Sequence, residues 1–258
     1  AVLDAKVLSR TQQLSEANAC LLREQETRHQ MMLNIFHDLR GPLFVIQGNL
    51  DIISTQESHS QSTRLDIIRN KVLFLQRLIE DLFLIAKLED HRISFLQEPV
   101  DLPALLRSSC AANLEAAYKK GLCLFLQLSG PLRMLGDPFR MEQILQNLLD
   151  NAFLYTPKGG RVTVALEREA DKAVIRVTDT GPGISAQDIP HIFERYYHGN
   201  SPRRSESTGL GLSIVRELVL AQGGDISVRS QPGQGSQFIL RFPLYSSPSI
   251  SEPDNPSP

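Results

Sequence analysis

The sequence predicts a multidomain chain with an α part and an α/β part. The first is a helical hairpin that forms a dimeric four-helix bundle, and the second is an α/β sandwich. Apolar residues recur at helical spacing from Leu39 to Ile53 and again from Leu65 to Ile85. Beyond Glu98-Pro99 the pattern changes to amphipathic helices interleaved with strands whose apolar residues alternate. Elements of this kind pack as helices on one face of a sheet.

Composition limits the functions open to the chain. It has 258 residues, of which 41% are apolar and 22% charged, which excludes wholesale disorder. The formal net charge is −2, so we expect no general attraction to nucleic acid or an anionic membrane. Apolar runs reach only five residues, for example Leu82–Ala86, whereas a membrane span needs roughly 20 residues, so none is predicted. Three cysteines without metal-ligand spacing predict reduced thiols in a cytosolic chain.

The first 30 residues predict a coiled-coil signalling helix. Residues 1–36 contain no proline or glycine. One apolar row repeats at multiples of seven residues, and a second row lies four positions earlier, which suits the a and d sites of a coiled coil. The two rows consist of Val7, Leu14, Leu21 and Ile35, and of Leu3, Ala17 and Met31. The chain starts inside this pattern without an initiator methionine, so we expect it to be cut from a longer protein.

Residues 31–95 predict the hairpin. The polar stretch Ser54–Ser62 separates its two long amphipathic helices, which pack antiparallel when the connection is short. Each helix carries more apolar surface than a lone hairpin can bury. Dimerisation into a four-helix bundle would bury that surface, so we expect a homodimer.

Residues 96–245 predict the sandwich, and the Pro- and Ser-rich residues 246–258 predict a disordered tail. The sequence favours a helix over 100–118 and a strand over 121–128. Asp137-Pro138 starts a helix that runs to about Tyr155, with Asp as the N-cap and Pro at the first helical position. Four further strands are expected near 162–166, 173–177, 225–230 and 236–243. Residues 185–222 are expected to mix short helices with a loop, and Gly223-Gly224 ends the last helix.

Three local features indicate chemistry. In Phe36–Leu43, a proline inside a helix costs roughly 3 kcal/mol and bends the helix one turn after His37. A helix that keeps such a bend beside the pair His37-Asp38 indicates a functional kink; the alternative is a solvated histidine on a helix face. Next, Asn147 and Asn151 share one helical stripe with Gln143. Their amide oxygens suit Mg²⁺, although a wet helix face is an equal alternative.

The third feature is a pair of glycine loops, Asp179–Gly183 after a strand and Ser207–Leu212 before a helix. An aspartate at a strand end can accept a hydrogen bond from an exocyclic amine. Glycines let the backbone approach a ligand, and N–H groups at a helix start can hold phosphate. Loops of this kind alone are weak evidence, because many are simple turns.

In this order and spacing, the three features resemble the cytoplasmic core of a sensor histidine kinase of two-component signalling. The resemblance covers about residues 30–244 and adds three motifs, which are Ile192–Tyr197, Gly209–Leu212 and Gly233–Phe238. It implies a dimeric hairpin joined to a Bergerat-type ATP-binding sandwich. It also implies a location in the cytoplasm, either free or as the cytoplasmic part of a membrane-anchored sensor. It also implies an upstream sensor domain that this chain lacks, and a response regulator as partner.

The resemblance also assigns roles. His37 would attack the γ-phosphorus of ATP, and Asp38 would orient the imidazole or act as a base. Asn151, helped by Asn147, would coordinate Mg²⁺; the family's ATPase relatives carry a Glu base at the position of Asn147. Asp179 would bind the adenine amine. The remaining nucleotide-binding residues would be Tyr155, stacked on the ring, Gly181, Gly183, Arg195 in a mobile lid over Glu194–Thr208, Thr208, Gly209, Leu210, Gly211 and Leu212.

Three positions depart from the family pattern: Leu154 replaces a lysine, His198 replaces an arginine, and Gly41 replaces a threonine or asparagine. The function expected is an ATP-dependent protein-histidine kinase that autophosphorylates His37 and passes the phosphoryl group to an aspartate of a response regulator. The alternative suggested by Leu154 and His198 is a degenerate kinase-like dimer that binds ATP as a conformational scaffold. A plain ATPase or chaperone would leave the His37 motif unexplained.

Overall fold

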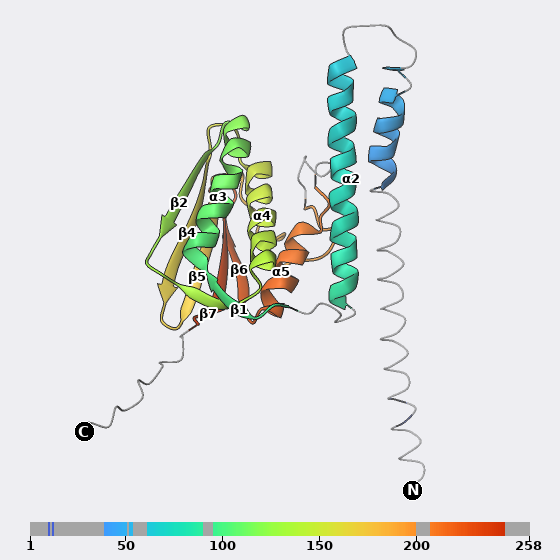
Figure 1. The fold of residues 1–258 in the computed structure, drawn as a ribbon. Helices are drawn as coiled ribbons and strands as arrows, with labels where there is room; N and C mark the ends of the chain where they lie inside the picture. Colours follow the sequence, from blue (N-terminus) through green and yellow to red (C-terminus); the bar gives the residue numbers. More distant parts are fainter. Residues whose placement is uncertain are drawn as a thin grey trace, which may run out of the picture. The chain divides into compact units, whose positions relative to one another are not determined.

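Figure 1 shows the computed structural model of the chain, which describes residues 10, 12, 39–50, 52–53, 61–89, 95–199 and 207–245. The pair His37-Asp38, the predicted tail over 246–258 and nearly all of the predicted coiled coil over 1–30 lie outside the described residues. The chain divides into two compact units, residues 1–80 and 81–258. The domain boundaries predicted from the sequence stay predictions.

The hairpin predicted from helical periodicity is present in the described residues. Residues 39–50 are helical through Pro42, and α2 runs from Gln61 to Glu89 (Figure 1). Arg64 Nη1 donates to Asn49 Oδ1 at 3.5 Å, which connects the two helices. Large apolar side chains remain exposed on both helices, for example Phe44 at 69% and Ile79 at 58%. The predicted homodimer would bury such side chains.

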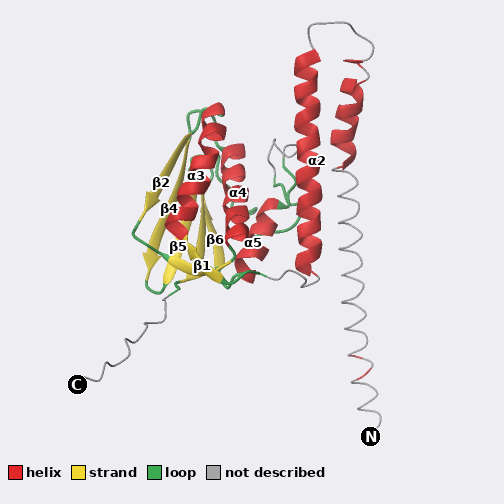
Figure 2. Ribbon diagram, viewed as in Figure 1, coloured by secondary structure: helices red, strands yellow, loops and turns green. Residues whose placement is uncertain are grey.

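The second unit has a five-stranded sheet covered on one face by three helices (Figure 2). The strand order is β2-β4-β5-β7-β6, in which β2 is parallel to β4 and the other pairs are antiparallel. These strands are β2 (Cys123–Leu128), β4 (Arg161–Glu169), β5 (Lys172–Asp179), β6 (Asp225–Ser230) and β7 (Ser236–Pro243). The helices are α3 (Leu102–Lys119), α4 (Pro138–Tyr155) and α5 (Gly211–Ala221). The predicted fold class, a helical part followed by an α/β sandwich, is confirmed.

Two helices begin where an aspartate caps the backbone and a proline follows. Asp137 Oδ1 accepts from the N–H of Arg140 at 3.2 Å, as the sequence predicted for the start of α4. Asp101 Oδ1 accepts from the N–H of Ala104 at 2.9 Å at the start of α3. These caps satisfy N–H groups that have no partner within the helix.

The core lies between the sheet and the helices, and strand alternation predicted it. The alternating apolar residues of β4 and β5 are all at most 1% exposed: Val162, Val164, Leu166, Ala173, Ile175 and Val177. On the other face, Val174 and Ile239 are also fully buried. Their cross-strand neighbours are Arg241 and Arg176, which pair with acidic residues on β4 and β6. The aliphatic stems of these arginines can cover the two apolar side chains.

Several expected boundaries are wrong. A short antiparallel ribbon of β1 (Glu98–Asp101) and β3 (Arg133–Gly136) was not predicted. The predicted helix over 100–118 begins at Leu102, because Glu98–Asp101 is a strand. The predicted strand over 121–128 begins at Cys123, because Gly121 forms a turn with φ 69°. The short helices expected after residue 185 are turns as far as residue 199.

Two further expectations concern membranes and thiols. Within the described residues, we find no helix with both the length and the apolar character needed to cross a membrane. The predicted cytoplasmic location stays a prediction. The two cysteines that the structure describes, Cys110 and Cys123, are free. Burial raises the pKa of the Cys110 thiol to about 11, so this thiol stays protonated near neutral pH.

The loop after β5 packs directly on the loop between β6 and β7, and a glycine makes this possible. Gly183 has φ 73°, and a Cβ there would lie 2.0 Å from the carbonyl oxygen of Gln231. The N–H of Gly233 donates to the carbonyl of Pro182 at 2.7 Å, which joins the same two loops. Backbone contact this close leaves no room for a side chain at residue 183.

We therefore predict that Gly183→Ala destabilises the second unit more than Gly130→Ala. Gly130 also has φ 73°, but nothing lies within 4 Å of a Cβ there. Gly130→Ala should lower the free energy of unfolding by roughly 1–2 kcal/mol, because only the left-handed conformation is unfavourable for alanine there. Gly183→Ala should lower it by about 1–3 kcal/mol more, because of the clash. Urea unfolding followed by tyrosine fluorescence measures this, because all five tyrosines lie between residues 118 and 245. Equal losses would contradict the close packing.

Candidate functional site

Asp179 is a buried carboxylate at the end of β5, with an exposed fraction of 6%. Its Oδ1 accepts from the N–H of Gly181 at 2.7 Å. Burial raises the pKa of the Asp179 carboxyl above its ordinary value, because a charge is poorly solvated there. Hydrogen bonds from the Gly181 N–H, and from the N–H and hydroxyl of Ser236, act in the opposite direction on this pKa. The carboxylate is therefore fixed in orientation at the end of its strand.

Ser236 is a site residue that the sequence analysis did not select. It belongs to the predicted motif Gly233–Phe238, and the sheet register places it directly opposite Asp179. The preceding residue, Gly235, has φ 84°, and a Cβ there would lie 2.0 Å from the carbonyl oxygen of Asp179. The motif Gly233–Phe238 is thus the surface against which Asp179 packs. Strand pairing, which the sequence alone did not provide, was the missing signal.

The C-terminal half of α4 lies beside both glycine loops. A Cβ on Gly181 would lie 3.2 Å from the carbonyl oxygen of Tyr155, the last residue of α4. A Cβ on Gly211, the first residue of α5, would lie 3.7 Å from Asn147 Oδ1. Asn151 lies one turn after Asn147 and is half-buried. The fold thus brings together the amide stripe, the Asp179 loop and the start of α5, which are far apart in the sequence.

Two observations show that this region suits an anionic ligand. The Nδ2 atom of Asn147 is buried and makes no hydrogen bond within the protein. In contrast to α3 and α4, α5 begins without a side-chain cap. Uncapped N–H groups at a helix start attract negative charge, and a buried amide without a partner needs a ligand or water. The residues present therefore fit the phosphate end of a nucleotide.

Hydrogen bonds join the residues just before position 200 to the residues just after position 206. The N–H of Tyr196 donates to the carbonyl of Gly209 at 2.9 Å, and His198 Nδ1 lies 3.1 Å from Ser207 Oγ. Gly209 has φ 67°, and a Cβ there would lie 2.8 Å from His198 Nε2. Thr208 Oγ1 accepts from the N–H of Leu210 at 3.3 Å. Predicted lid residues therefore lie directly before α5.

The other predicted residues are placed as follows. Leu210 is fully buried, Leu212 is half-buried at the second position of α5, and Arg195 is half-buried before Tyr196. Among the departures from the family pattern, Leu154 is half-buried on α4. Gly41 is exposed, with nothing within 4 Å of a Cβ there. His37 and Asp38 are not among the described residues.

A hydrogen-bonded cluster supports the loop between Asp179 and Tyr196. Asp188 accepts from the hydroxyl of Tyr197 at 2.6 Å and from that of Ser185 at 2.8 Å. These hydrogen bonds lower the pKa of the Asp188 carboxyl, and the bond to Asp188 raises the pKa of the Tyr197 hydroxyl. The sequence analysis included Tyr197 only in the motif Ile192–Tyr197 and did not select Asp188 or Ser185. The three residues hold the loop in shape.

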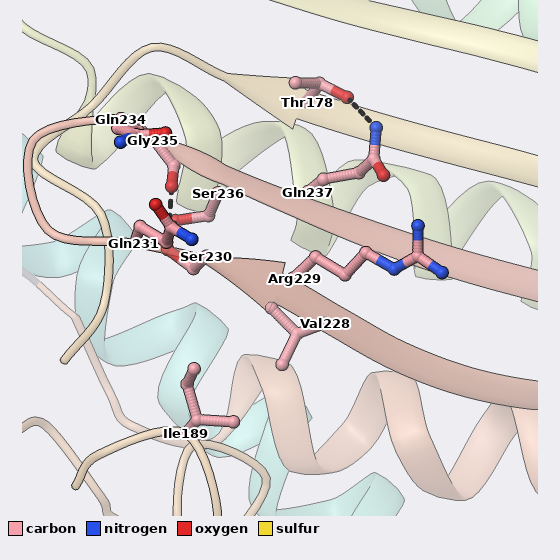
Figure 3. Close-up of a pocket in the computed structure, with 10 residues that line it drawn as sticks. All are labelled: Thr178, Ile189, Val228, Arg229, Ser230, Gln231, Gln234, Gly235, Ser236 and Gln237. Carbon is pink, nitrogen blue, oxygen red and sulfur yellow. Dashed lines mark hydrogen bonds between the residues drawn. The ribbon is translucent and has the colours of Figure 1, made fainter. Parts of the chain in front are cut away.

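A cavity of about 490 Å³ lies beside this region, at the loop end of β6 and β7. Figure 3 shows the residues that line it. Its lining includes Ser236 and Gly235 but neither Asp179 nor Asn147. Polar groups in the lining bond to each other, since Gln237 Nε2 donates to Thr178 Oγ1 at 3.1 Å. The candidate site is therefore the region between Asp179, Asn147 and Gly211 rather than this cavity.

Comparison with known proteins agrees with this geometry. Residues 136–246 match the family described as histidine kinase-, DNA gyrase B- and HSP90-like ATPase, and residues 27–91 match the His kinase A phospho-acceptor domain. The chain is 32% identical over 237 residues to the sensor histidine kinase RcsC of Escherichia coli, covering 90% of this chain and 25% of RcsC. The sensor histidine kinase RppB of Synechocystis sp. is 31% identical over 236 residues, covering 89% of this chain and 52% of RppB. The chain therefore spans a quarter to a half of the length of these relatives.

Solved structures show the same likeness. The Acinetobacter baumannii histidine kinase AdeS aligns with a TM-score of 0.68 at 26% identity, covering 81% of this chain and 98% of that chain. Full-length ShkA in complex with AMPPNP aligns with a TM-score of 0.64 at 28% identity, covering 82% of this chain and 45% of that chain. With a phospho-acceptor domain and a histidine kinase-like ATPase domain matched in one sequence, the chain belongs to the sensor histidine kinase family.

Proposed function

We propose that this chain is an ATP-dependent protein-histidine kinase that phosphorylates its own His37 as a homodimer. One observation carries the proposal. The chain combines two features. It matches a phospho-acceptor domain over a range that includes His37, and it has a site around Asp179 and Asn147 that is suited to bind a nucleotide. The phosphoryl group would then pass to an aspartate of a response regulator. A binding scaffold would need only the second of these features.

The adenine end of the site is built around Asp179. A fixed, buried carboxylate at a strand end is suited to accept a hydrogen bond from the adenine 6-amino group, since its Oδ1 is already held by Gly181. A buried polar contact of this kind discriminates strongly between nucleotide bases, because a base without the matching donor leaves the buried carboxylate unpaired. Tyr155, next to Gly181, would stack on the ring. Gly181 and Gly183 allow the loop after Asp179 to pack closely on Tyr155 and Gln231, which sets the shape of this side of the site.

The phosphate end is built from α4 and the start of α5. Asn151 and Asn147 would hold Mg²⁺ through amide oxygens, and the N–H groups of Gly211 and Leu212 would face phosphate oxygens. The positive charge of an ion held by these two asparagines would offset the negative charge that develops on the phosphates during transfer. An asparagine at position 147 cannot deprotonate water, which favours transfer to histidine over hydrolysis. The predicted lid would form the remaining side of the site, with Arg195, Thr208, Gly209 and Leu210.

The transfer step requires a neutral imidazole. One ring nitrogen of His37 would form the N–P bond as the bond between the γ-phosphorus and the β–γ bridging oxygen breaks, releasing ADP. Asp38 would hold the N–H of the other nitrogen, which fixes the tautomer and stabilises positive charge on the ring. The phosphoryl group would pass from the nitrogen to a carboxylate oxygen of the response regulator, returning a neutral imidazole.

The first prediction from this proposal concerns the acceptor. His37→Gln should abolish acid-labile phosphate on the protein after incubation with Mg-ATP, because no other side chain replaces the nucleophile. Radiolabelled ATP and acid treatment of the filtered protein measure it. His91→Gln, a second histidine within the matched phospho-acceptor range, should retain the label.

ATP affinity separates this outcome from misfolding and should remain within a few-fold of the unmodified chain. Persistent acid-labile phosphate in His37→Gln would exclude His37 as the acceptor. A chain that binds ATP but never becomes labelled would favour the scaffold alternative.

The second prediction concerns Mg²⁺. Asn151→Ala should reduce the gain in ATP affinity that Mg²⁺ provides by about tenfold, the equivalent of a lost contact of about 1–3 kcal/mol. Calorimetric titration with Mg²⁺ and with a chelator separates the two affinities. The matched control is Gln143→Ala on the same helix, because Gln143 Oε1 already accepts from Arg140 Nη1 at 3.0 Å. An equal loss in both variants, or a loss that persists without Mg²⁺, would remove Asn151 from the metal site.

A further inference from the structure

Asp137 holds two segments that lie 41 residues apart in the sequence. Its Oδ1 caps α4 through the N–H of Arg140 at 3.2 Å, and its Oδ2 accepts from the N–H of Leu96 at 3.2 Å. The residue is 6% exposed. A helix cap needs only one oxygen. The second oxygen binds the stretch that precedes β1.

The backbone of the same residue is bonded to α5. The N–H of Asp137 donates to Gln222 Oε1 at 2.8 Å, and Gln222 is the buried C-cap of α5. A Cβ on Gly136 would lie 2.7 Å from the same oxygen, so a glycine here admits the glutamine amide. One residue thus connects residues 95–101, the start of α4 and the end of α5.

The two helices fastened at this point carry the phosphate end of the candidate site. Asn147 and Asn151 lie farther along α4, and Gly211 is the opposite end of α5. A helix is a stiff element, so a displacement at one end is carried to the other. Because the Leu96 N–H is bonded to the cap of α4, a shift of the entering segment acts directly on the helix that carries the asparagines.

We propose that Asp137 is a positioning residue, which couples the conformation of the segment over residues 95–101 to nucleotide binding between α4 and α5. The inference rests on the proposed function for the identity of the nucleotide. Coupling between two sites is reciprocal. If an ordered segment favours nucleotide binding, then nucleotide must order the segment by the same factor.

Two variants break the bond from opposite ends. Asp137→Ser keeps one oxygen to cap α4 and removes the oxygen that binds Leu96. Leu96→Pro removes the N–H donor and leaves the cap unchanged, and the Leu96 side chain is 60% exposed, so little packing is lost. The matched control is Asp101→Ser, since Asp101 caps α3 through Ala104 and is exposed. Tyrosine fluorescence in urea verifies that each variant folds.

The measurement is hydrogen exchange of residues 95–101 in the full chain, with and without AMPPNP, together with AMPPNP affinity. In the unmodified chain, AMPPNP should slow exchange of this segment by about fivefold or more. Both Asp137→Ser and Leu96→Pro should lose that protection, and their affinity should fall by the same factor. Asp101→Ser should retain both properties.

Exchange that does not respond to AMPPNP in the unmodified chain, while AMPPNP binds, would overturn this inference and leave the proposed function intact. If Asp137→Ser loses AMPPNP affinity and Leu96→Pro does not, the loss would be assigned to the altered helix cap. That result would also overturn this inference. A chain that binds no AMPPNP would overturn both proposals. Should Asp137→Ser fail to fold, Leu96→Pro decides the question, because it leaves both helix caps in place.

Discussion

The second unit is organised around the buried carboxylate of Asp179. Burying such a group is unfavourable unless hydrogen bonds compensate for the lost water. Here the compensation comes from the N–H of Gly181 and from Ser236 on the neighbouring strand. Both donors require the backbone to come very close, which explains why Gly181 and Gly235 carry no side chain. The glycine motifs thus allow the backbone to come close enough to donate hydrogen bonds to the aspartate.

The two helices α4 and α5 extend this arrangement to the proposed phosphate end of the site. Asn147 on α4 lies beside Gly211, where α5 begins without a side-chain cap. At their other ends, both helices are tied to Asp137. The proposed site is therefore bounded by two helices that are fixed at the ends away from Asn147 and Gly211. The proposed acceptor, His37, precedes this unit in the sequence, so the proposed transfer requires its imidazole to reach the nucleotide.

Features set by neighbours in the sequence could be predicted, and features set by strand pairing could not. The cap at Asp137-Pro138 and the alternation of Val162, Val164 and Leu166 depend on residues close in sequence, and both are confirmed. The contribution of Ser236 follows from its register with Asp179, and the β1–β3 ribbon pairs segments of only four residues each. Val174 is buried on the outer face beside Arg241, which no alternation rule anticipates. The roles of His37 and the asparagines rest on resemblance and stay predictions.

The most direct test of an ATP site centred on Asp179 is a comparison of ATP with ITP, in which a carbonyl oxygen replaces the 6-amino group. The phosphates, the ribose and the Mg²⁺ requirement are the same in both nucleotides, so a difference in affinity reports the base contact alone. The carboxylate should then face an acceptor instead of a donor, and ITP should bind about tenfold more weakly or worse. Equal dissociation constants for the two nucleotides, measured by calorimetric titration of the full chain, would contradict the assignment of Asp179 to the adenine ring.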